Sequence, residues 1–106
     1  MKIGTWCCLL MVSLLCILLL ACGGKDPAQQ VYADMERILE AVYADLGRPA
    51  LSYASMREVH DAAFERMQAK RTDWPAGTSF ATSVLEDHIM LYVKVGDTTA
   101  EGNWKP

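Results

Sequence analysis

The apolar and polar residues between positions 26 and 71 alternate with the period of amphipathic helices. Apolar residues recur at three- and four-residue intervals from Val31 to Leu46, so this stretch predicts a first helix with one stripe facing a core. The stripe consists of Val31, Met35, Ile38, Leu39, Val42 and Leu46. Asp26 as the N-cap and Pro27 at the first helical position predict where the helix begins, and Gly47 predicts where it ends.

A second amphipathic pattern predicts a helix from Ser52 to about Arg71. Its apolar face consists of Met56, Val59, Ala63, Phe64 and Met67, with His60 near the centre. Ser52 is suited to cap this helix, and Ser55 with Glu58 offers an alternative start. Because only a short turn with glycine and proline joins the two helices, we expect them to form an antiparallel helical hairpin.

The third segment, residues 78–95, is harder to assign because its composition and its spacing favour different elements. The stretch HIMLYVKV is rich in residues that favour strands. At helical spacing, however, one face collects Ala81, Val84, Leu85, His88, Leu91, Tyr92 and Val95. A lone strand would leave its backbone groups unpaired, because no other part of the chain predicts a strand. We therefore favour a helix, although helix and strand both stay open for residues 84–95.

These elements together predict an all-α fold, a small three-helix bundle over residues 26–95 with a polar C-terminal tail over 96–106. A hairpin of two helices cannot cover both sides of a third helix. The apolar residues that lie off the main face of this third helix therefore need another partner. The tail adds a single aromatic residue, Trp104. The resulting candidates for a partner contact are Ile89, Met90, Val93 and Trp104.

The two tryptophans that follow the second helix, Trp74 and Trp104, lie in predicted loops. Tryptophans in loops serve either as anchors at a lipid or protein interface or as covers over the end of a core. We favour the second interpretation for both residues, and the first keeps Trp104 among the partner-contact candidates.

The chain begins with a segment that differs from the rest in composition. Residues 1–22 carry a single charge, Lys2, followed by an apolar run from Ile3 to Leu20. A basic start, an apolar run and a small residue, Ala21, before Cys22 are typical of an export signal. The run is also about as long as the shortest segments that span a bilayer, so an uncleaved membrane helix is the alternative.

The stretch Leu19-Leu20-Ala21-Cys22 resembles the lipobox of bacterial lipoproteins, and the resemblance covers only the export segment. It implies that residues 1–21 are a signal peptide that is cut off, and that the Cys22 thiol carries a diacylglycerol. It also implies that the new amino terminus is acylated, for example with palmitate, and two or more acyl chains hold a protein firmly to a bilayer. Residues 22–25 would then be the lipidated anchor and a short tether.

The family resemblance also implies a location. Gly23 after the cysteine, rather than an aspartate, directs the lipoproteins of a two-membrane bacterium to the outer membrane. We therefore expect an outer-membrane lipoprotein whose domain lies on the periplasmic face. In a bacterium with a single membrane, the same anchor leaves the domain on the outer face of the cell membrane.

Charge and cysteine content exclude several classes of protein. Without Lys2, nine basic residues remain against thirteen acidic ones, so the rest of the chain has a net charge of −4. Such a balance provides no basic surface for nucleic acid, and we expect no nucleic-acid partner. Cys7, Cys8 and Cys16 lie in the signal segment and Cys22 is lipidated, so a thiol-disulfide oxidoreductase and a cysteine metal site are not expected.

His60 and His88 are the only candidates for metal or pH-dependent chemistry. Each lies near the middle of a predicted apolar face with an acidic neighbour, Asp61 or Asp87. Two histidines are too few for a zinc site, and neighbouring residues on a helix point about 100° apart, so the acids would not complete it. We expect core histidines, no metal and no cofactor. The chain also has no motif of a catalytic nucleophile or a phosphate-binding loop, so we expect no enzyme.

The sequence thus predicts a small non-enzymatic lipoprotein that serves as an adaptor for an envelope complex. In size, anchor and helix content it resembles the small helical lipoproteins called pilotins, with no motif in common. Its expected partners are the bilayer through Cys22 and an envelope protein or a second copy of the chain. An immunity, inhibitor or exclusion lipoprotein, which blocks an incoming toxin, lytic enzyme or mating partner, is the alternative, and a purely structural envelope protein is a third.

Overall fold

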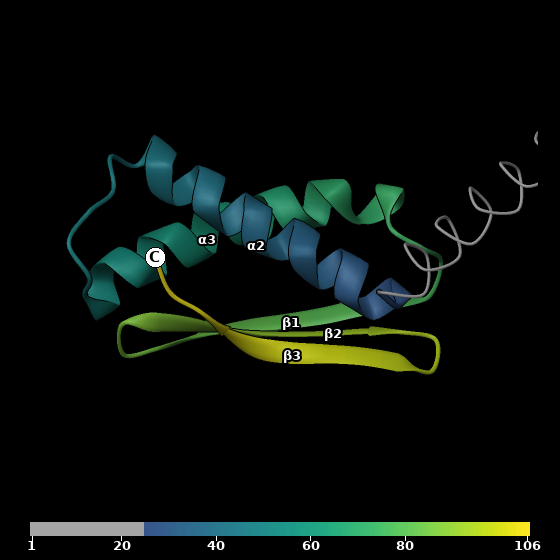
Figure 1. Ribbon diagram of the computed structural model, residues 1–106. Coiled ribbons are helices and arrows are strands. Elements are labelled where there is room, and N and C mark those ends of the chain that lie inside the picture. The colour runs from purple at the N-terminus through teal and green to yellow at the C-terminus, as the bar shows by residue number, and fades with distance from the viewer. Residues whose placement is uncertain (1–24) are drawn as a thin grey trace, which may run out of the picture.

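A computed structural model describes residues 25–106 as two helices followed by a three-stranded sheet (Figure 1). The elements are α2 (Pro27–Asp45), α3 (Tyr53–Lys70), the short 3-10 helix η1 (Arg71–Asp73), β1 (Thr78–Leu85), β2 (His88–Val95) and β3 (Thr98–Trp104). The predicted signal peptide, the cysteine anchor and most of the tether lie outside the described residues. No helix within residues 25–106 is long and apolar enough to cross a membrane.

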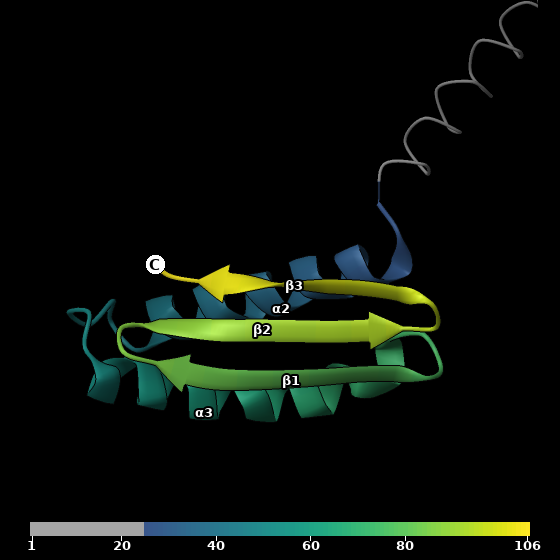
Figure 2. The same ribbon diagram turned by 90° about the horizontal axis from the view of Figure 1, so that it is seen from below.

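The strands form an antiparallel sheet in the order β1-β2-β3, and both helices lie on the same face of it (Figures 1 and 2). Helix α3 packs over β1, and α2 packs over β2 and β3. The molecule is therefore a two-layer structure, with the core between the helices and the sheet. Because the chain turns back after every element, one end of the domain holds the start of α2 and the β2–β3 turn, and the other holds the α2–α3 loop and the β1–β2 turn.

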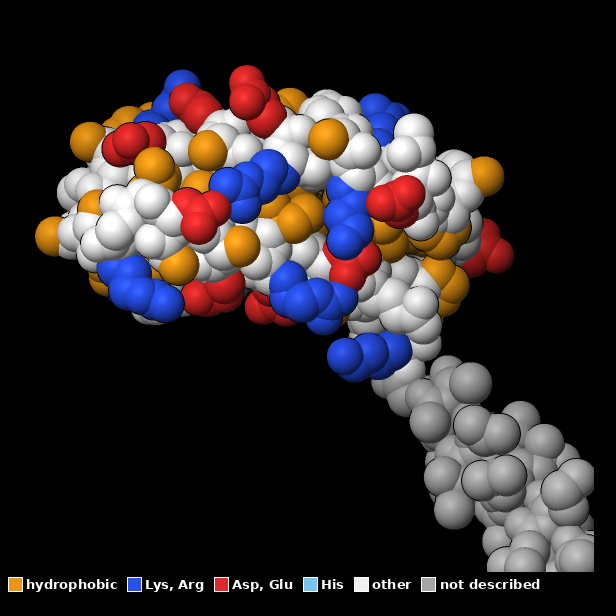
Figure 3. Space-filling model, turned by 90° about the horizontal axis from the view of Figure 1, so that it is seen from above, with side chains coloured by type: hydrophobic (Ala, Val, Ile, Leu, Met, Phe, Trp, Pro, Cys, Tyr) orange, Lys and Arg blue, Asp and Glu red, His pale blue; other side chains and the backbone are white. Residues whose placement is uncertain are grey.

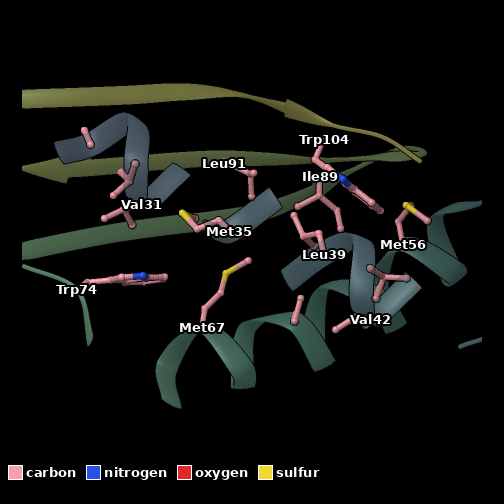
Figure 4. Close-up of a cluster of buried hydrophobic side chains, with 14 of the residues drawn as sticks. Val31, Met35, Leu39, Val42, Met56, Met67, Trp74, Ile89, Leu91 and Trp104 are labelled. Carbon is pink, nitrogen blue, oxygen red and sulfur yellow. The ribbon is translucent and has the colours of Figure 1, made fainter. Parts of the chain in front are cut away.

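The core is built from one face of each helix and the inner face of the sheet. Its buried residues are Ala28, Val31, Met35, Leu39, Val42, Met56, Val59, Ala63, Met67, Trp74, Ile89, Leu91, Val93, Val95 and Trp104. Figure 4 shows Trp74 and Trp104 at opposite ends of this cluster, with the aliphatic and methionine side chains between them. The expectation that these tryptophans cover the ends of a core is confirmed, since their side chains are 7% and 4% exposed.

The two predicted helices are confirmed, together with their caps. The Asp26 carboxylate accepts a hydrogen bond of 2.8 Å from the Gln29 N–H at the start of α2. Gly47 adopts the left-handed conformation that ends this helix, with φ of +83°. Ser52 is the cap of α3, because its hydroxyl accepts from the Ser55 N–H at 3.0 Å. The later start at Ser55 is therefore wrong.

The prediction of a third helix over residues 78–95 is wrong, and with it the all-α three-helix bundle. This segment forms β1 and β2, which pair along their whole length and are joined by the two residues Glu86 and Asp87. A lone strand was rejected because it would lack a partner, but the segment supplies both strands of a hairpin. The spacing of its apolar residues fits period two in β2, where buried residues alternate with exposed ones.

The expectation of a polar tail over residues 96–106 is corrected in the same way. Gly96 and Asp97 form a turn, and Thr98–Trp104 is β3, which pairs with β2. Inward-facing Ala100 lies opposite Val93, and Trp104 lies opposite Ile89. Residues 26–95, predicted as a helical domain, therefore lack the last strand of the sheet.

Candidate functional site

No helix or strand within residues 25–106 covers one face of the sheet, which we call the open face. Side chains alternate along a strand, so every second residue of the sheet points away from the helices. The outward-pointing residues are Ser79, Ala81, Ser83 and Leu85 of β1, His88, Met90, Tyr92 and Lys94 of β2, and Thr99, Glu101 and Asn103 of β3. Figure 2 shows the three strands from this side, with no described element in front of them.

The open face is apolar at its centre and slightly hollow. Ala81, Tyr92 and Glu101 form one row across the three strands, and Ser83, Met90 and Asn103 form the next. A shallow depression of about 460 Å³ lies over these two rows. The large side chains of β2 lie beside the small side chains of β1, so the face is uneven. Side chains of another surface can fit into its depression.

The open face also has the composition of a protein interface. The side chains of Leu85, Met90 and Tyr92 are 51%, 43% and 38% exposed. Lys94 and Glu101 are its only lysine, arginine, aspartate or glutamate residues. By contrast, lysine, arginine, aspartate and glutamate side chains are interspersed over the helix side (Figure 3). Interface cores are depleted in charge and enriched in tyrosine and methionine, which favours a binding role for the open face.

A second exposed apolar region lies at the end of the domain that holds the α2–α3 loop, which we call the far end. Leu46, Leu51 and Tyr53 are exposed there, and Tyr53 is 55% accessible. Together with Leu85, Met90 and Tyr92 of the open face they are the large apolar side chains exposed in residues 25–106. None of the six lies at the opposite end, the N-terminal end, where α2 begins and β2 turns into β3.

The four residues predicted to contact a partner are separated by the sheet. Met90 lies on the open face, whereas Ile89, Val93 and Trp104 point to the helices and are buried. The Trp104 indole N–H also donates to Glu40 Oε1 at 3.0 Å, which fixes the ring in the core. Alternation along β2 and β3 therefore leaves Met90 exposed and places Ile89, Val93 and Trp104 in the core. Tyr92, next to Met90 on the open face, was missed because it was placed on the inner side of a helix.

Trp74 closes the core at the N-terminal end of the domain. Its indole N–H donates to Asp34 Oδ2 at 3.1 Å, and its ring meets Phe80 edge-on with centroids 5.4 Å apart. Both tryptophans are thus held by a carboxylate of α2, an arrangement that satisfies a polar group that would otherwise be costly to bury.

The two histidines lie on opposite faces of the sheet and form no joint site. His60 of α3 contacts Thr82 Oγ1 through Nε2 at 2.7 Å and Asp61 Oδ1 through Nδ1 at 3.0 Å. Although neighbouring helical residues diverge, the Asp61 carboxylate reaches the ring of His60, and this hydrogen bond is the main cause that lowers the pKa of Asp61. Within the described part of the chain, no three histidine, cysteine or acidic residues are grouped to hold a metal ion.

His88 belongs to a small charged group beside the β1–β2 turn. The Asp87 carboxylate lies 3.0 Å from Lys105 Nζ and 3.5 Å from His88 Nδ1. Lys105 first, and then His88, lower the pKa of the Asp87 carboxyl. This group is partly exposed and lies at the end of the sheet, where it stabilises the turn.

Comparison of the chain with protein-family models, with curated protein sequences and with solved structures gives no match. The function is therefore argued from the geometry alone. The two exposed apolar regions are suited to binding other surfaces. In residues 25–106 the acidic, histidine and hydroxyl side chains that make polar contacts do so in separate ion pairs, helix caps and hydrogen bonds.

Proposed function

We propose that the protein is a lipid-anchored, non-enzymatic adaptor of the bacterial envelope that binds an envelope protein at its far end. The lipobox-like stretch ending at Cys22 supports the anchor, and the position of α2 supports a close approach to the bilayer. Lys25 is three residues after Cys22, which corresponds to at most about 11 Å of extended chain. The N-terminal end of the domain is then adjacent to the lipid.

The observation that carries this proposal is the distribution of exposed apolar side chains relative to the anchor. Leu46, Leu51 and Tyr53 lie at the far end, and α2, with 19 residues, separates that end from the anchor by about 28 Å. A domain that used its surface to insert into lipid would expose apolar side chains next to the anchor instead. Their position at the far end is suited to a protein partner that meets the domain away from the bilayer.

The first experiment tests the far end as a docking site. The tagged full chain is purified with its envelope partners from cells, and proteins enriched with the wild type are compared with those enriched with the double variant Leu51→Asp, Tyr53→Asp. We expect at least one envelope protein to be lost with this variant and retained with the control Glu65→Lys, an exposed change on α3. The proposal is wrong if the same proteins are enriched with both variants while the fold is intact by circular dichroism.

The second experiment tests the anchor independently. Mass spectrometry of the purified chain is expected to find Cys22 as the first residue, with a diacylglycerol on its sulfur. Cys22→Ser is expected to release the domain from the membrane fraction. Recovery of Met1 on a chain that stays in the membrane with an unmodified thiol would contradict the anchor and favour the uncleaved membrane helix.

The immunity or inhibitor lipoprotein is the alternative function. Such a protein would be expected to rely on an acidic surface that complements an incoming enzyme or toxin. Figure 3 shows both signs of charge mixed over the helix side. The adaptor is therefore the better supported of the two.

A further inference from the structure

We infer that β1 binds an extended segment of a partner protein, with alternating apolar and polar residues, which pairs with the free edge of the sheet as a fourth strand. The sheet has the order β1-β2-β3, so β1 pairs with a described strand on one side only. Figure 2 shows no described element beyond its other side. This edge is a different surface from the far end, and the inference does not depend on the lipid anchor.

The turn between β1 and β2 determines which backbone groups of β1 are free. In a two-residue hairpin turn the closing residues, here Leu85 and His88, bond to each other. Bonded and non-bonded pairs then alternate along an antiparallel ladder. We therefore expect the N–H and C=O groups of Phe80, Thr82 and Val84 to be directed away from β2, toward the free edge.

These backbone groups are available to another strand. Thr78 belongs to the same series, and its N–H donates to the Pro75 carbonyl oxygen at 3.2 Å, which agrees with the alternation. No turn, cap or side chain within residues 25–106 bonds the backbone of Phe80, Thr82 or Val84. Another extended backbone can bond all of these groups in register, because its own donors and acceptors repeat with the same spacing.

β1 also lacks the features by which natural proteins protect a free edge. Its sequence TSFATSVL contains no charged residue and no proline, and its eight residues pair with β2 without a bulge. The other edge strand, β3, carries Glu101 at its centre and is followed directly by Lys105 and Pro106. These differences favour addition of a strand at β1 rather than at β3.

The side chains on the helix side of this edge favour an apolar partner. Phe80 and Val84 are only half-buried, whereas the inward residues of β2 are buried. The Phe64 ring of α3 lies 5.7 Å from the Phe80 ring between centroids, and it stacks on the His60 ring. Apolar side chains of an added strand would continue the core at this edge and cover Phe64, Phe80 and Val84.

The side chains on the open face favour a polar partner. The residues of β1 on this face, Ser79, Ala81 and Ser83, are small and exposed. Side chains of an added strand beside them remain in contact with solvent, so polar residues are suited to these positions. The partner segment therefore alternates apolar and polar residues over about five to seven positions, with no charge at its centre.

The position of α3 argues against a second copy of the chain as the occupant. α3 lies over β1, where His60 contacts Thr82, and Figure 2 shows it extending past the strand on the free side. Pairing of β1 with its own copy would place the two α3 helices about 5 Å apart, because paired strands are separated by about 5 Å. Packed helices need about 8–10 Å between their axes. A bare strand meets only the flank of α3.

The first test follows the amides of the purified full chain in detergent micelles by NMR hydrogen exchange. Without a ligand, we expect the amides of Phe80, Thr82 and Val84 to exchange rapidly and those of Ala81 and Ser83, directed toward β2, to be protected. The probe is the peptide KTVTVTVK with blocked ends, in which threonine and valine alternate. At saturation, we expect the Thr82 and Val84 amides to exchange at least about ten-fold more slowly.

The control peptide KTTTVVVK has the same composition without the alternation, and we expect it to bind at least about ten-fold more weakly. Binding of the alternating peptide without protection of Thr82 and Val84 would place it elsewhere on the molecule and overturn the inference. Equal binding of the two peptides, or no binding of the alternating one, would also overturn it. Protection of these amides that rises with protein concentration alone would indicate a second copy, and would overturn it as well.

The second test removes one donor from the edge. Val84→Pro deletes an N–H that is directed away from β2, and proline is tolerated at such positions of edge strands. We expect it to weaken peptide binding about five-fold, which corresponds to one hydrogen bond. Val84→Thr keeps the N–H and the shape of the side chain, and is expected to change binding by less than about two-fold. Equal losses with both variants would assign the contact to the side chain and contradict strand addition.

The same bond can be removed from the peptide, which keeps the test independent of how well Val84→Pro folds. N-methylation of the central valine is expected to weaken binding about five-fold, because its N–H is directed toward β1. N-methylation of the threonine before it, whose N–H is directed away from β1, is the control. Equal effects of the two methyl groups would overturn the inference.

These results are separable from the proposed function. The Leu51→Asp, Tyr53→Asp variant is expected to lose the envelope partner and to bind the peptide as the wild type does. A chain that captures its partner at the far end, but shows no protection of Thr82, retains the proposed function and loses the added strand. Loss of peptide binding in the far-end variant would place the peptide at the far end and overturn the inference.

Discussion

Gly102 of β3 lies against the hydroxyl end of the Tyr32 side chain of α2, and this close approach joins the last strand to the first helix. A Cβ atom at position 102 would lie 2.4 Å from the Tyr32 hydroxyl oxygen and 3.4 Å from the ring carbon that carries it. Partial burial, and then the nearby Glu36 carboxylate, raise the pKa of the Tyr32 hydroxyl. The glycine is thus required by packing rather than by its backbone conformation.

We therefore predict that Gly102→Ala destabilises the protein by about 1–3 kcal/mol, the usual cost of overpacking. Tyr32→Phe removes the oxygen and leaves the methyl group in ordinary contact, so it is expected to recover most of this loss in the double variant. Urea unfolding of the four proteins in a double-mutant cycle measures the coupling. Additive effects of the two substitutions would contradict the contact.

Neighbouring residues of β2 have opposite roles, although the sequence suggests the same role for them. Ile89 is fully buried and Met90 is 43% exposed. We predict that Ile89→Ala lowers the free energy of unfolding by about 2–5 kcal/mol, whereas Met90→Ala changes it by less than about 0.5 kcal/mol. Thermal unfolding followed by circular dichroism checks both. Similar losses for the two variants would indicate that the register of β2 is shifted by one residue.

At the scale of elements, the two helices were predictable because their caps and their apolar stripes agree.

The three strands were not predictable, since the apolar residues of segment 78–95 fit one face of a helix as well as the alternating pattern of a strand. The β1–β2 turn is formed by Glu86 and Asp87, with Glu86 at φ of +55°, and it lacks the glycine or asparagine that usually marks a hairpin. β3 contains threonines, glycine and asparagine with few apolar residues, so its sequence gives little sign of a strand. The alternation of Ile89, Leu91, Val93 and Val95 was the signal that could have identified the sheet.

The β1–β2 turn is held by the Asp87 carboxylate, whose pKa lies below its ordinary value chiefly because of Lys105. A lowered pKa in the folded state means that the contact stabilises the fold above about pH 4 and is lost as the pH falls through the folded pKa. We predict that Lys105→Met raises the pKa of Asp87 toward its ordinary value, as measured by NMR titration of the carboxyl carbon. Lys94→Met, which removes a lysine elsewhere on the sheet, is expected to leave this pKa unchanged.

At the scale of the whole molecule, the sequence predicts a lipid anchor, which lies outside the described residues, but it does not predict the exposed apolar surfaces. The candidate contact residues were chosen as the second stripe of a helix, and that choice assigned Met90 to the surface together with the core residues Ile89 and Val93. Tyr92 and the far-end residues Leu51 and Tyr53 become evident only when the layers are known. A surface that is assembled from a sheet depends on pairing between distant segments, which periodicity within one segment does not report.

The last strand closes the structure, and its removal tests whether residues 26–95 are a domain. A chain that ends at Val95 loses Ala100 and Trp104 from the core and leaves the β2 edge unpaired. Removal of a buried tryptophan side chain alone costs about 3–5 kcal/mol, against a total stability of about 5–15 kcal/mol for a typical domain. We predict that this chain loses its cooperative thermal transition and is rapidly digested by protease, whereas a chain that ends at Trp104 keeps both properties. A cooperative transition at the wild-type temperature for the shorter chain would show that the two helices and a hairpin suffice, and that β3 is the dispensable tail that the sequence suggests.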